Sequence, residues 1–293
     1  MRVGFIGLGR MGRGMAGRVL GGGHDLAVFD AVAAATAELG TAGARVATSV
    51  ADVCSGREVV ITMLVEDAVI LDVALRPGGL CQSLPKGAIH MVSGTHGVAT
   101  IRALEEAHAR AGQTLVATPV LGRPDLAASG QLGVVPGGPD EAVAKCQPLL
   151  ELIGKRIFPA GPKPECATAI KLANNAVLGC AMVAMAEGFA LVRKYGVQPQ
   201  VFQDVMVEGL FAATAYKVYG QKMVDESYDQ VGSPITVGLK DAMLIAAAAD
   251  VARVPMPSHD IYHQRLLGAV AHGDAERDQA VLAREQARAS GLE

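Results

Sequence analysis

Residues 2–12 read RVGFIGLGRMG, an apolar run that leads into three glycines at positions 7, 9 and 12, and a helical stretch follows them. A strand, a G-x-G-x-x-G turn and a helix in this order begin a dinucleotide-binding βαβ unit. Gly7 permits the tight turn, Gly9 leaves room for a pyrophosphate, and Gly12 lets the helix pack closely on the strand. The free N–H groups of the helix N-terminus attract the phosphate anion. This stretch therefore predicts a nucleotide-binding loop.

The second apolar run, DLAVFD, ends at Asp30, about 20 residues after the loop, where such folds place an acidic residue. A carboxylate there accepts hydrogen bonds from an adenine-ribose 2′-hydroxyl and repels a 2′-phosphate, and Ala31 supplies no cation to receive one. The pattern favours NAD over NADP, and we assign Arg10 and Met11 of the glycine loop to the same cofactor site. The alternative is that Asp30 only caps the following helix.

Short Val/Ile/Leu-rich runs alternate with Ala-rich helical stretches over the first half of the chain. The runs are RVGFIG, DLAVFD, VVITML, AIHMVS, TLVATPV and QLGVVPG. Such alternation predicts βαβ units around a mainly parallel, doubly wound sheet of the Rossmann type. We place this α/β domain at residues 1–163, up to the segment Gly161-Pro162-Lys163-Pro164.

Long Ala/Leu/Met segments dominate after that point and predict an all-α domain over residues 164–293. A helix without internal proline is expected from about residue 166 to 195, ending at Gly196, and it joins the two domains. Further helices are expected at 199–209, 214–225, 237–252 and from 258 into the tail.

The composition excludes several classes of protein. The chain has 293 residues, a net charge of −3, and 51% hydrophobic and 19% charged residues, which is typical of a compact globule and argues against nucleic-acid binding. Its five cysteines are scattered and odd in number, as in a reducing compartment. The early glycines and arginines interrupt any signal peptide, and we expect a cytoplasmic protein without a membrane anchor. The seven histidines show no metal-ligand motif, so no metal site is expected.

A polar stripe interrupts the long apolar helix in the sequence AIKLANNAVL. Lys171, Asn174 and Asn175 are spaced i, i+3 and i+4, so all three project from one face. Their flanking residues are apolar and leave little obvious solvent face. Burying a lysine and two amides is costly unless they serve something polar, although a partly solvated surface stripe is the alternative.

The chain as a whole resembles the β-hydroxyacid dehydrogenases, a family that includes 3-hydroxyisobutyrate dehydrogenase and tartronate semialdehyde, glyoxylate and sulfolactaldehyde reductases. The resemblance rests on six blocks in order: GFIGLGRMGRGMA, VVITML at 59–64, SGT at 93–95, ATPVLGRPDLAASGQL at 117–132, KLANN at 171–175 and LKDAMLIA at 239–246. It implies a nicotinamide-dependent oxidoreductase that acts on a small anionic hydroxyacid or semialdehyde.

The resemblance also implies roles for individual residues. Lys171 matches the lysine that exchanges a proton with the substrate oxygen, Asn175 matches the amide that orients it, and Asn174 is expected to help hold the acid group. On the cofactor side it implies contacts from four residues: Met63, Leu64, Thr95 and Lys240.

The substrate loop departs from the family pattern. Relatives usually read D-A-P-V-S-G-G, whereas this chain reads ATPVLGR at 117–123. Leu121 cannot supply the expected hydroxyl, but Gly122 keeps room for an acid group and Arg123 adds a guanidinium suited to a carboxylate, sulfonate or phosphate. Arg123 could instead face solvent or the cofactor phosphates. Ser233 stands where many relatives have an aromatic residue, which predicts a larger or more polar pocket.

Two other functions share this fold plan. An imine reductase generally lacks the lysine found here at 171, and a non-catalytic nucleotide-binding protein would lack it too. The apolar helical half is expected to bury surface against a second copy, as in the family, giving a homodimer or a homotetramer.

Overall fold

The computed structural model describes residues 1–292 and divides into two compact units, Met1–Lys171 and Leu172–Glu293. The division falls inside one long helix, α9 (Pro164–Lys194), which begins one residue after the boundary expected from the sequence. Each unit has a hydrophobic core of its own.

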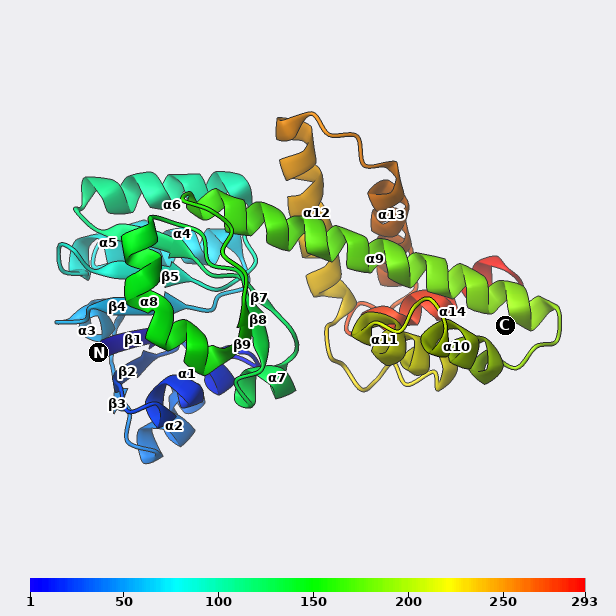
Figure 1. Ribbon diagram of the computed structural model, residues 1–293, viewed down its shortest axis with the longest axis horizontal. Coiled ribbons are helices and arrows are strands. Elements are labelled where there is room, and N and C mark those ends of the chain that lie inside the picture. The colour runs from blue at the N-terminus through cyan, green and yellow to red at the C-terminus, as the bar shows by residue number, and fades with distance from the viewer. Residues whose placement is uncertain (293) are drawn as a thin grey trace. The chain divides into compact units, whose positions relative to one another are not determined.

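A six-stranded, entirely parallel sheet forms the centre of the first unit (Figure 1). Its strand order is β3-β2-β1-β4-β5-β6. The strands are β1 (Arg2–Ile6), β2 (Asp25–Phe29), β3 (Arg45–Val46), β4 (Val59–Thr62), β5 (Ile89–Val92) and β6 (Thr114–Ala117). Five of the predicted runs supply β1, β2, β4, β5 and β6, and the order reverses between β1 and β4, so the doubly wound Rossmann prediction is confirmed.

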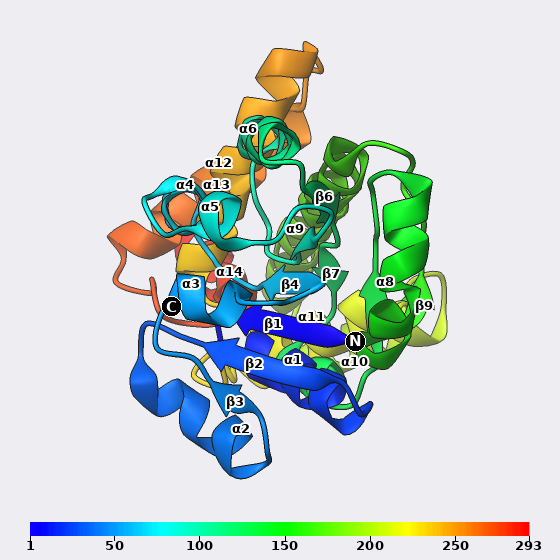
Figure 2. The same ribbon diagram turned by 90° about the vertical axis from the view of Figure 1, so that its left-hand side faces the viewer.

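Helices cover both faces of this sheet (Figure 2). One apolar cluster joins the strands to α1 (Gly12–Gly21), α2 (Ala37–Thr41) and α8 (Asp140–Ile153). The other joins them to α3 (Val50–Cys54), α4 (Asp67–Leu75), α5 (Leu80–Ser83) and α6 (Val98–Arg110). A short 3-10 turn, η1 (Ala33–Thr36), precedes α2. Because both faces are buried, the strands are continuous apolar runs rather than alternating ones.

A second, three-stranded sheet carries the segment predicted for the substrate. It consists of β7 (Val120–Leu121), β8 (Leu132–Val134) and β9 (Gly154–Ile157), and α7 (Pro124–Ala128) lies between β7 and β8. The β7–β8 pair is antiparallel and the β8–β9 pair is parallel. The predicted run QLGVVPG thus forms a strand, but in this separate sheet.

The second unit is helical, as predicted. It contains the rest of α9, α10 (Pro199–Glu208), α11 (Thr214–Val224), α12 (Ile235–Ala252), α13 (Pro257–Ala271), the 3-10 turn η2 (Gln279–Val281) and α14 (Leu282–Ala289). The prediction of one helix from 258 into the tail was wrong. His272 caps α13, Gly273 adopts φ +83°, and the chain turns before η2 and α14.

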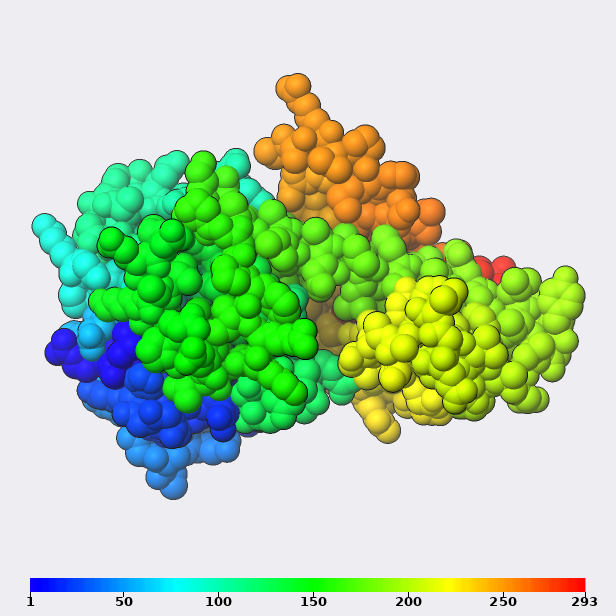
Figure 3. Space-filling model, in the orientation of Figure 1, coloured from blue at the N-terminus to red at the C-terminus, as the bar shows by residue number. Residues whose placement is uncertain are grey.

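Helix α9 ends as expected: Gly196 adopts φ +76°, and its N–H and that of Val197 bond back to the last turn of the helix. Among residues 1–292, α9 is long and apolar enough to cross a membrane by length and composition, a test that core helices of soluble proteins also meet. In Figure 3 its yellow-green second half lies at the surface of the second unit. The expectation that its polar stripe has little solvent face was wrong, because Ile170 and Val177 are 43% and 71% exposed.

Candidate active site

The glycine loop after β1 has the geometry of a phosphate-binding turn. Gly7 adopts φ +92°, and a Cβ there would overlap the carbonyl oxygen of Met63. A Cβ on Gly12 would overlap the carbonyl oxygen of Gly7, so α1 packs directly on the loop. By contrast, a Cβ on Gly9 would meet nothing within 4 Å.

The first turn of α1 holds no acidic side chain, and no side chain caps it, so its N–H groups suit an external anion. Together with the open side of Gly9, this arrangement fits the pyrophosphate of a nicotinamide dinucleotide. Arg10 lies exposed beside it, and Met11 is the N-cap residue.

Asp30 is fastened to the glycine loop. Its Oδ2 accepts a hydrogen bond from the Leu8 N–H at 2.6 Å, and its Oδ1 accepts one from the Val32 N–H at 2.8 Å. The second bond is a local turn contact and does not cap the following helix, because Val32 is the N-cap residue of η1 and no side chain caps that turn. The first bond joins the segments that follow β1 and β2. The carboxylate therefore stands fixed at the carboxyl edge of β2, beside the loop.

Met63 and Leu64 follow β4 and lie against the same turn, since a Cβ on Gly7 would be 2.9 Å from Leu64 Cδ2. The segment that carries Thr95 follows β5 and packs on Leu64, whose carbonyl oxygen a Cβ on Gly94 would overlap. The structure thus brings the predicted cofactor residues of the first unit together at the carboxyl ends of β1, β2, β4 and β5, where doubly wound sheets bind ligands.

A partly buried cluster around Asp67, which includes the neighbour of Thr95, was not predicted from the sequence. Asp67, at the start of α4, accepts hydrogen bonds from His96 Nδ1 at 2.9 Å and Thr100 Oγ1 at 2.7 Å, and two weaker ones from the Gly97 N–H. Burial acts to raise the pKa of Asp67, but these hydrogen bonds outweigh it and leave the pKa below its usual value. The cluster ties α4 to the start of α6. The acidic first residue of a helix was its only sequence signal.

Lys171 lies on α9 and reaches the predicted substrate loop. Its Nζ donates a hydrogen bond to the carbonyl oxygen of Val120 at 2.9 Å, across 51 residues of sequence. Lys171 and the predicted substrate loop therefore meet within the first unit.

Gly122 has a structural reason to be glycine, because its φ is +144° and a Cβ there would lie 2.7 Å from Leu132 Cδ2. Arg123 is the N-cap residue of α7, with its side chain 41% exposed and its Nε 3.5 Å from Asp125 Oδ1. The neighbouring carboxylate offsets part of the charge that the sequence assigned to an anion.

In the second unit, Asp241 on α12 holds two of the predicted residues. Asn175 Nδ2 donates a hydrogen bond to Asp241 Oδ2 at 2.8 Å, and Lys240 Nζ forms an ion pair with Asp241 Oδ1 at 2.8 Å. The side chains of Lys240 and Asp241 are only 15% and 13% exposed. From residue type and spacing alone, Lys240 and Asp241 would be read as an ordinary solvated surface pair.

Two predicted substrate-side residues differ in setting. Asn174 is exposed, on the same side of α9 as Ile170 and Val177. Ser233 accepts a hydrogen bond from Gln279 Nε2 at 2.8 Å, and Gln279 Oε1 in turn accepts one from Tyr262 at 2.7 Å. Among residues 1–292, no group of three or more His, Cys, Asp or Glu side chains could hold a metal ion.

A parallel sheet of order 3-2-1-4-5-6 with a glycine-rich loop after its first strand defines a Rossmann-type dinucleotide-binding protein. Residues 2–161 match the family model described as the NAD binding domain of 6-phosphogluconate dehydrogenase. Residues 166–285 match the model described as NAD-binding of NADP-dependent 3-hydroxyisobutyrate dehydrogenase.

Individual proteins agree with these matches. An uncharacterized oxidoreductase of Bacillus subtilis is 33% identical over 282 residues, covering 96% of this chain and 98% of that protein. An NAD-dependent L-serine dehydrogenase of Pseudomonas aeruginosa is 33% identical over 289 residues, covering 96% of each. The structure of Mycobacterium tuberculosis 3-hydroxyisobutyrate dehydrogenase with L-serine shares the fold, with a TM-score of 0.87, 23% identity, and coverage of 96% of this chain and 97% of that one. The chain belongs to the 3-hydroxyisobutyrate dehydrogenase family of NAD(P)-dependent oxidoreductases.

Proposed function

We propose that this protein transfers hydride between NAD and a short β-hydroxyacid or the corresponding semialdehyde, with Lys171 as the general acid and base. The observation that carries the proposal is the hydrogen bond from Lys171 Nζ to the Val120 carbonyl, because it holds the lysine against the substrate loop. Family membership supports the reaction class.

The chain's own residues have distinct tasks in this reaction. A bound nicotinamide supplies the hydride acceptor or donor. During oxidation Lys171 takes the proton of the substrate hydroxyl, and during reduction it gives a proton to the carbonyl oxygen. Asn175, one helical turn further along α9, orients the lysine and the substrate, and Asp241 fixes the amide of Asn175.

The substrate is small and anionic in this proposal. Gly122, Arg123 and Asn174 are the residues assigned to its acid group. Arg123 lies near Asp125, whose carboxylate partly neutralises its charge. We therefore expect Arg123 to strengthen substrate binding only when its guanidinium turns from Asp125 to the acid group of the ligand. L-Serine, itself a β-hydroxyacid, joins the candidates because a relative is named for it.

A screen that follows the nicotinamide absorbance tests the reaction, with NADH or NADPH for the aldehydes and NAD⁺ or NADP⁺ for the hydroxyacids and L-serine. Its candidates are glyoxylate, the succinic, methylmalonic, tartronic and sulfolactic semialdehydes, the matching hydroxyacids and L-serine. We expect turnover with at least one member of this set. A cyclic imine is assayed beside this set, and turnover of the imine alone would favour the imine reductase alternative. Nucleotide binding without turnover of any of these compounds would favour a non-catalytic nucleotide-binding protein.

We propose NAD rather than NADP as the cofactor. Asp30 offers a fixed carboxylate at the end of β2, and the exposed residues that follow it, Ala31 and Val32, carry no positive charge for a 2′-phosphate. A lower Michaelis constant for NADPH than for NADH would contradict this preference.

We further propose a cytoplasmic homodimer or homotetramer. Several apolar side chains of α9 and α10 are exposed in the second unit, among them Val177 at 71%, Leu191 at 61% and Val205 at 67%. Large apolar side chains left exposed on helices are what a second copy of the chain would cover in an interface. Light scattering is expected to give at least twice the chain mass, and a monomer would refute the proposal.

A further inference from the structure

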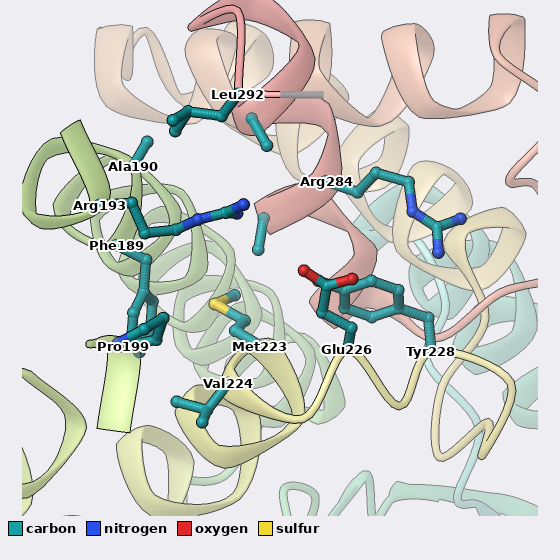
Figure 4. A pocket seen from close by; sticks show the side chains of 12 residues that line it. Phe189, Ala190, Arg193, Pro199, Met223, Val224, Glu226, Tyr228, Arg284 and Leu292 are labelled. Atoms are coloured by element: carbon teal, nitrogen blue, oxygen red, sulfur yellow. The ribbon is translucent and has the colours of Figure 1, made fainter. Parts of the chain in front are cut away.

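A cavity in the second unit lies apart from every residue assigned to the reaction. It has a volume of about 190 Å³ and is lined from α9, α10, α11, α14 and the segment that follows α11 (Figure 4). A dry cavity of about 150 Å³ is enough to bind benzene. This cavity can therefore receive a small organic molecule.

Its walls are apolar on one side and charged on another. Phe189 and Met223 are buried at 4% and 5% exposure, and Leu292 completes the apolar wall. The charged groups are Arg193 and Glu226, whose guanidinium and carboxylate point into the same space in Figure 4.

The two arginines that line the cavity, Arg193 and Arg284, differ in the contacts of their side chains. Arg284 donates a hydrogen bond to Asp274 Oδ1 at 3.3 Å and stacks on the Tyr228 ring with 4.9 Å between its Cζ and the ring centroid. Within residues 1–292, the guanidinium of Arg193 forms no hydrogen bond or ion pair, although the residue is partly buried and its backbone carbonyl accepts a hydrogen bond from the Gly196 N–H. Its position in the last turn of α9 is favourable for a cation, but the charge is left for an external anion.

Glu226 holds its place at a conformational cost. It follows the C-cap residue of α11 and adopts φ +49°, a left-handed conformation in which glycine is usual. Arg253 at the end of α12 has a similar φ, so the backbone alone marks no site. Glu226 differs from Arg253 because its carboxylate faces the same cavity as the guanidinium of Arg193 (Figure 4).

We propose that this cavity binds an α-amino acid with an apolar side chain. The ligand's carboxylate pairs with Arg193, its ammonium group pairs with Glu226, and its side chain packs on Phe189, Met223 and Leu292. A guanidinium takes a carboxylate in a bidentate pair, and a carboxylate on the opposite wall selects against ligands without a cation. The site is independent of the reaction proposed above.

Calorimetric titration of the full chain with L-leucine tests the proposal, since leucine lacks the hydroxyl that the reaction requires. Saturable binding is expected for leucine. Two analogues each lack one charge: 4-methylpentanoate has no ammonium group and 3-methylbutylamine has no carboxylate. Each is expected to bind at least about tenfold more weakly, which corresponds to one lost charged contact. Equal binding of the three ligands, or no binding of leucine, would overturn the proposal.

Variants separate the site from the fold. Arg193→Gln and Glu226→Gln are each expected to weaken leucine binding at least about tenfold, whereas Glu208→Gln, an exposed carboxylate outside the lining, leaves it unchanged. Glu226→Gly is expected to raise the melting temperature, because glycine relieves the left-handed backbone, and yet to lose leucine binding. Lys171→Ala is expected to bind leucine normally. If it does not, or if leucine competes with the substrate, the ligand occupies the reaction site and the proposal fails.

Discussion

Asp241 is the residue that connects two separate predictions in the helical unit. Its two carboxylate oxygens hold Asn175 on one side and Lys240 on the other. Sequence interpretation named both partners but not the residue between them, because an acidic side chain next to a lysine is a common surface pattern. The identity of a positioning residue depends on a contact across 66 residues, which spacing cannot reveal.

Removing this carboxylate is expected to impair both partners at once. We predict that Asp241→Ala lowers kcat/KM about 10- to 100-fold, corresponding to the loss of about 1.5–3 kcal/mol from one charged hydrogen bond and one ion pair. The binding constant for NADH reports on Lys240 and kcat reports on Asn175. Asp241→Asn keeps one oxygen acceptor, so its kcat/KM is expected to lie between those of the wild-type protein and Asp241→Ala.

Asp250→Ala is the matched control, since Asp250 is an exposed residue on the same helix α12. It is expected to leave both constants unchanged. If Asp241→Ala behaves like Asp250→Ala, the two contacts have no part in the reaction.

Helix α1 offers an experiment at the scale of one element. Gly12 and Gly21 are its first and last residues. A Cβ on Gly12 would overlap the Gly7 carbonyl oxygen, while one on Gly21 would meet nothing within 4 Å. The same substitution therefore has opposite consequences at the two ends.

We predict that Gly12→Ala lowers the free energy of unfolding by about 1–3 kcal/mol, because the loop must move, and that it weakens NADH binding. Gly21→Ala is expected to raise it by about 0.5–1 kcal/mol through the lower entropy of the unfolded chain. Urea unfolding measures the free energy of unfolding of both variants. If the two substitutions change it in the same direction, the close packing of Gly12 on the loop does not explain why this position is glycine.

The elements that could be predicted are those with long, regular patterns. Apolar runs bounded by glycine and proline predicted the strands β1, β2, β4, β5 and β6 and the helices α9 to α12. The two-residue strand β3 and the strand β9, which follows α8 without a break, have no such signal. The solvent face on α9 was missed because Ile170 and Val177 are apolar, and sequence cannot say which apolar side chains stay exposed.

We expect the stability of the folded chain to vary with pH because of a fully buried pair of histidines in the α/β unit, His90 and His108. Gln113 Nε2 donates to the Cys81 and Leu84 carbonyls, so its Oε1 must accept from His108 Nδ1. If both rings are neutral, His108 Nε2 then accepts from His90 Nδ1 at 2.8 Å, and His90 Nε2 accepts from the Thr62 hydroxyl at 2.9 Å. A further proton on His90 Nε2 would require the Thr62 hydroxyl to turn from donor to acceptor.

Burial lowers the pKa of both histidines because it disfavours the charged ring, and the neighbouring His108 ring lowers the pKa of His90 further. The unfolded chain takes up protons near pH 6.5 where the folded chain does not, so stability is lost as the pH falls through that value. Each histidine is expected to lower the free energy of unfolding by about 1.4 kcal/mol for each pH unit below about pH 6.5.

Urea unfolding between about pH 7.5 and pH 5.5 measures this slope. His108→Gln, whose amide keeps a donor and an acceptor, is expected to show a shallower slope. A free energy of unfolding that does not change with pH over this window would contradict the neutral assignment.

The central claim, that Lys171 exchanges a proton with the substrate oxygen, is tested most directly by the turnover number of Lys171→Ala with the best substrate of the screen, measured beside its NADH binding constant. We predict that kcat falls about 10²- to 10⁴-fold, the usual contribution of a general acid or base, while NADH binds as tightly as before. Lys171→Arg, which keeps the charge but cannot release its proton near neutral pH, is expected to be nearly as impaired. An unchanged kcat in Lys171→Ala would contradict the mechanism.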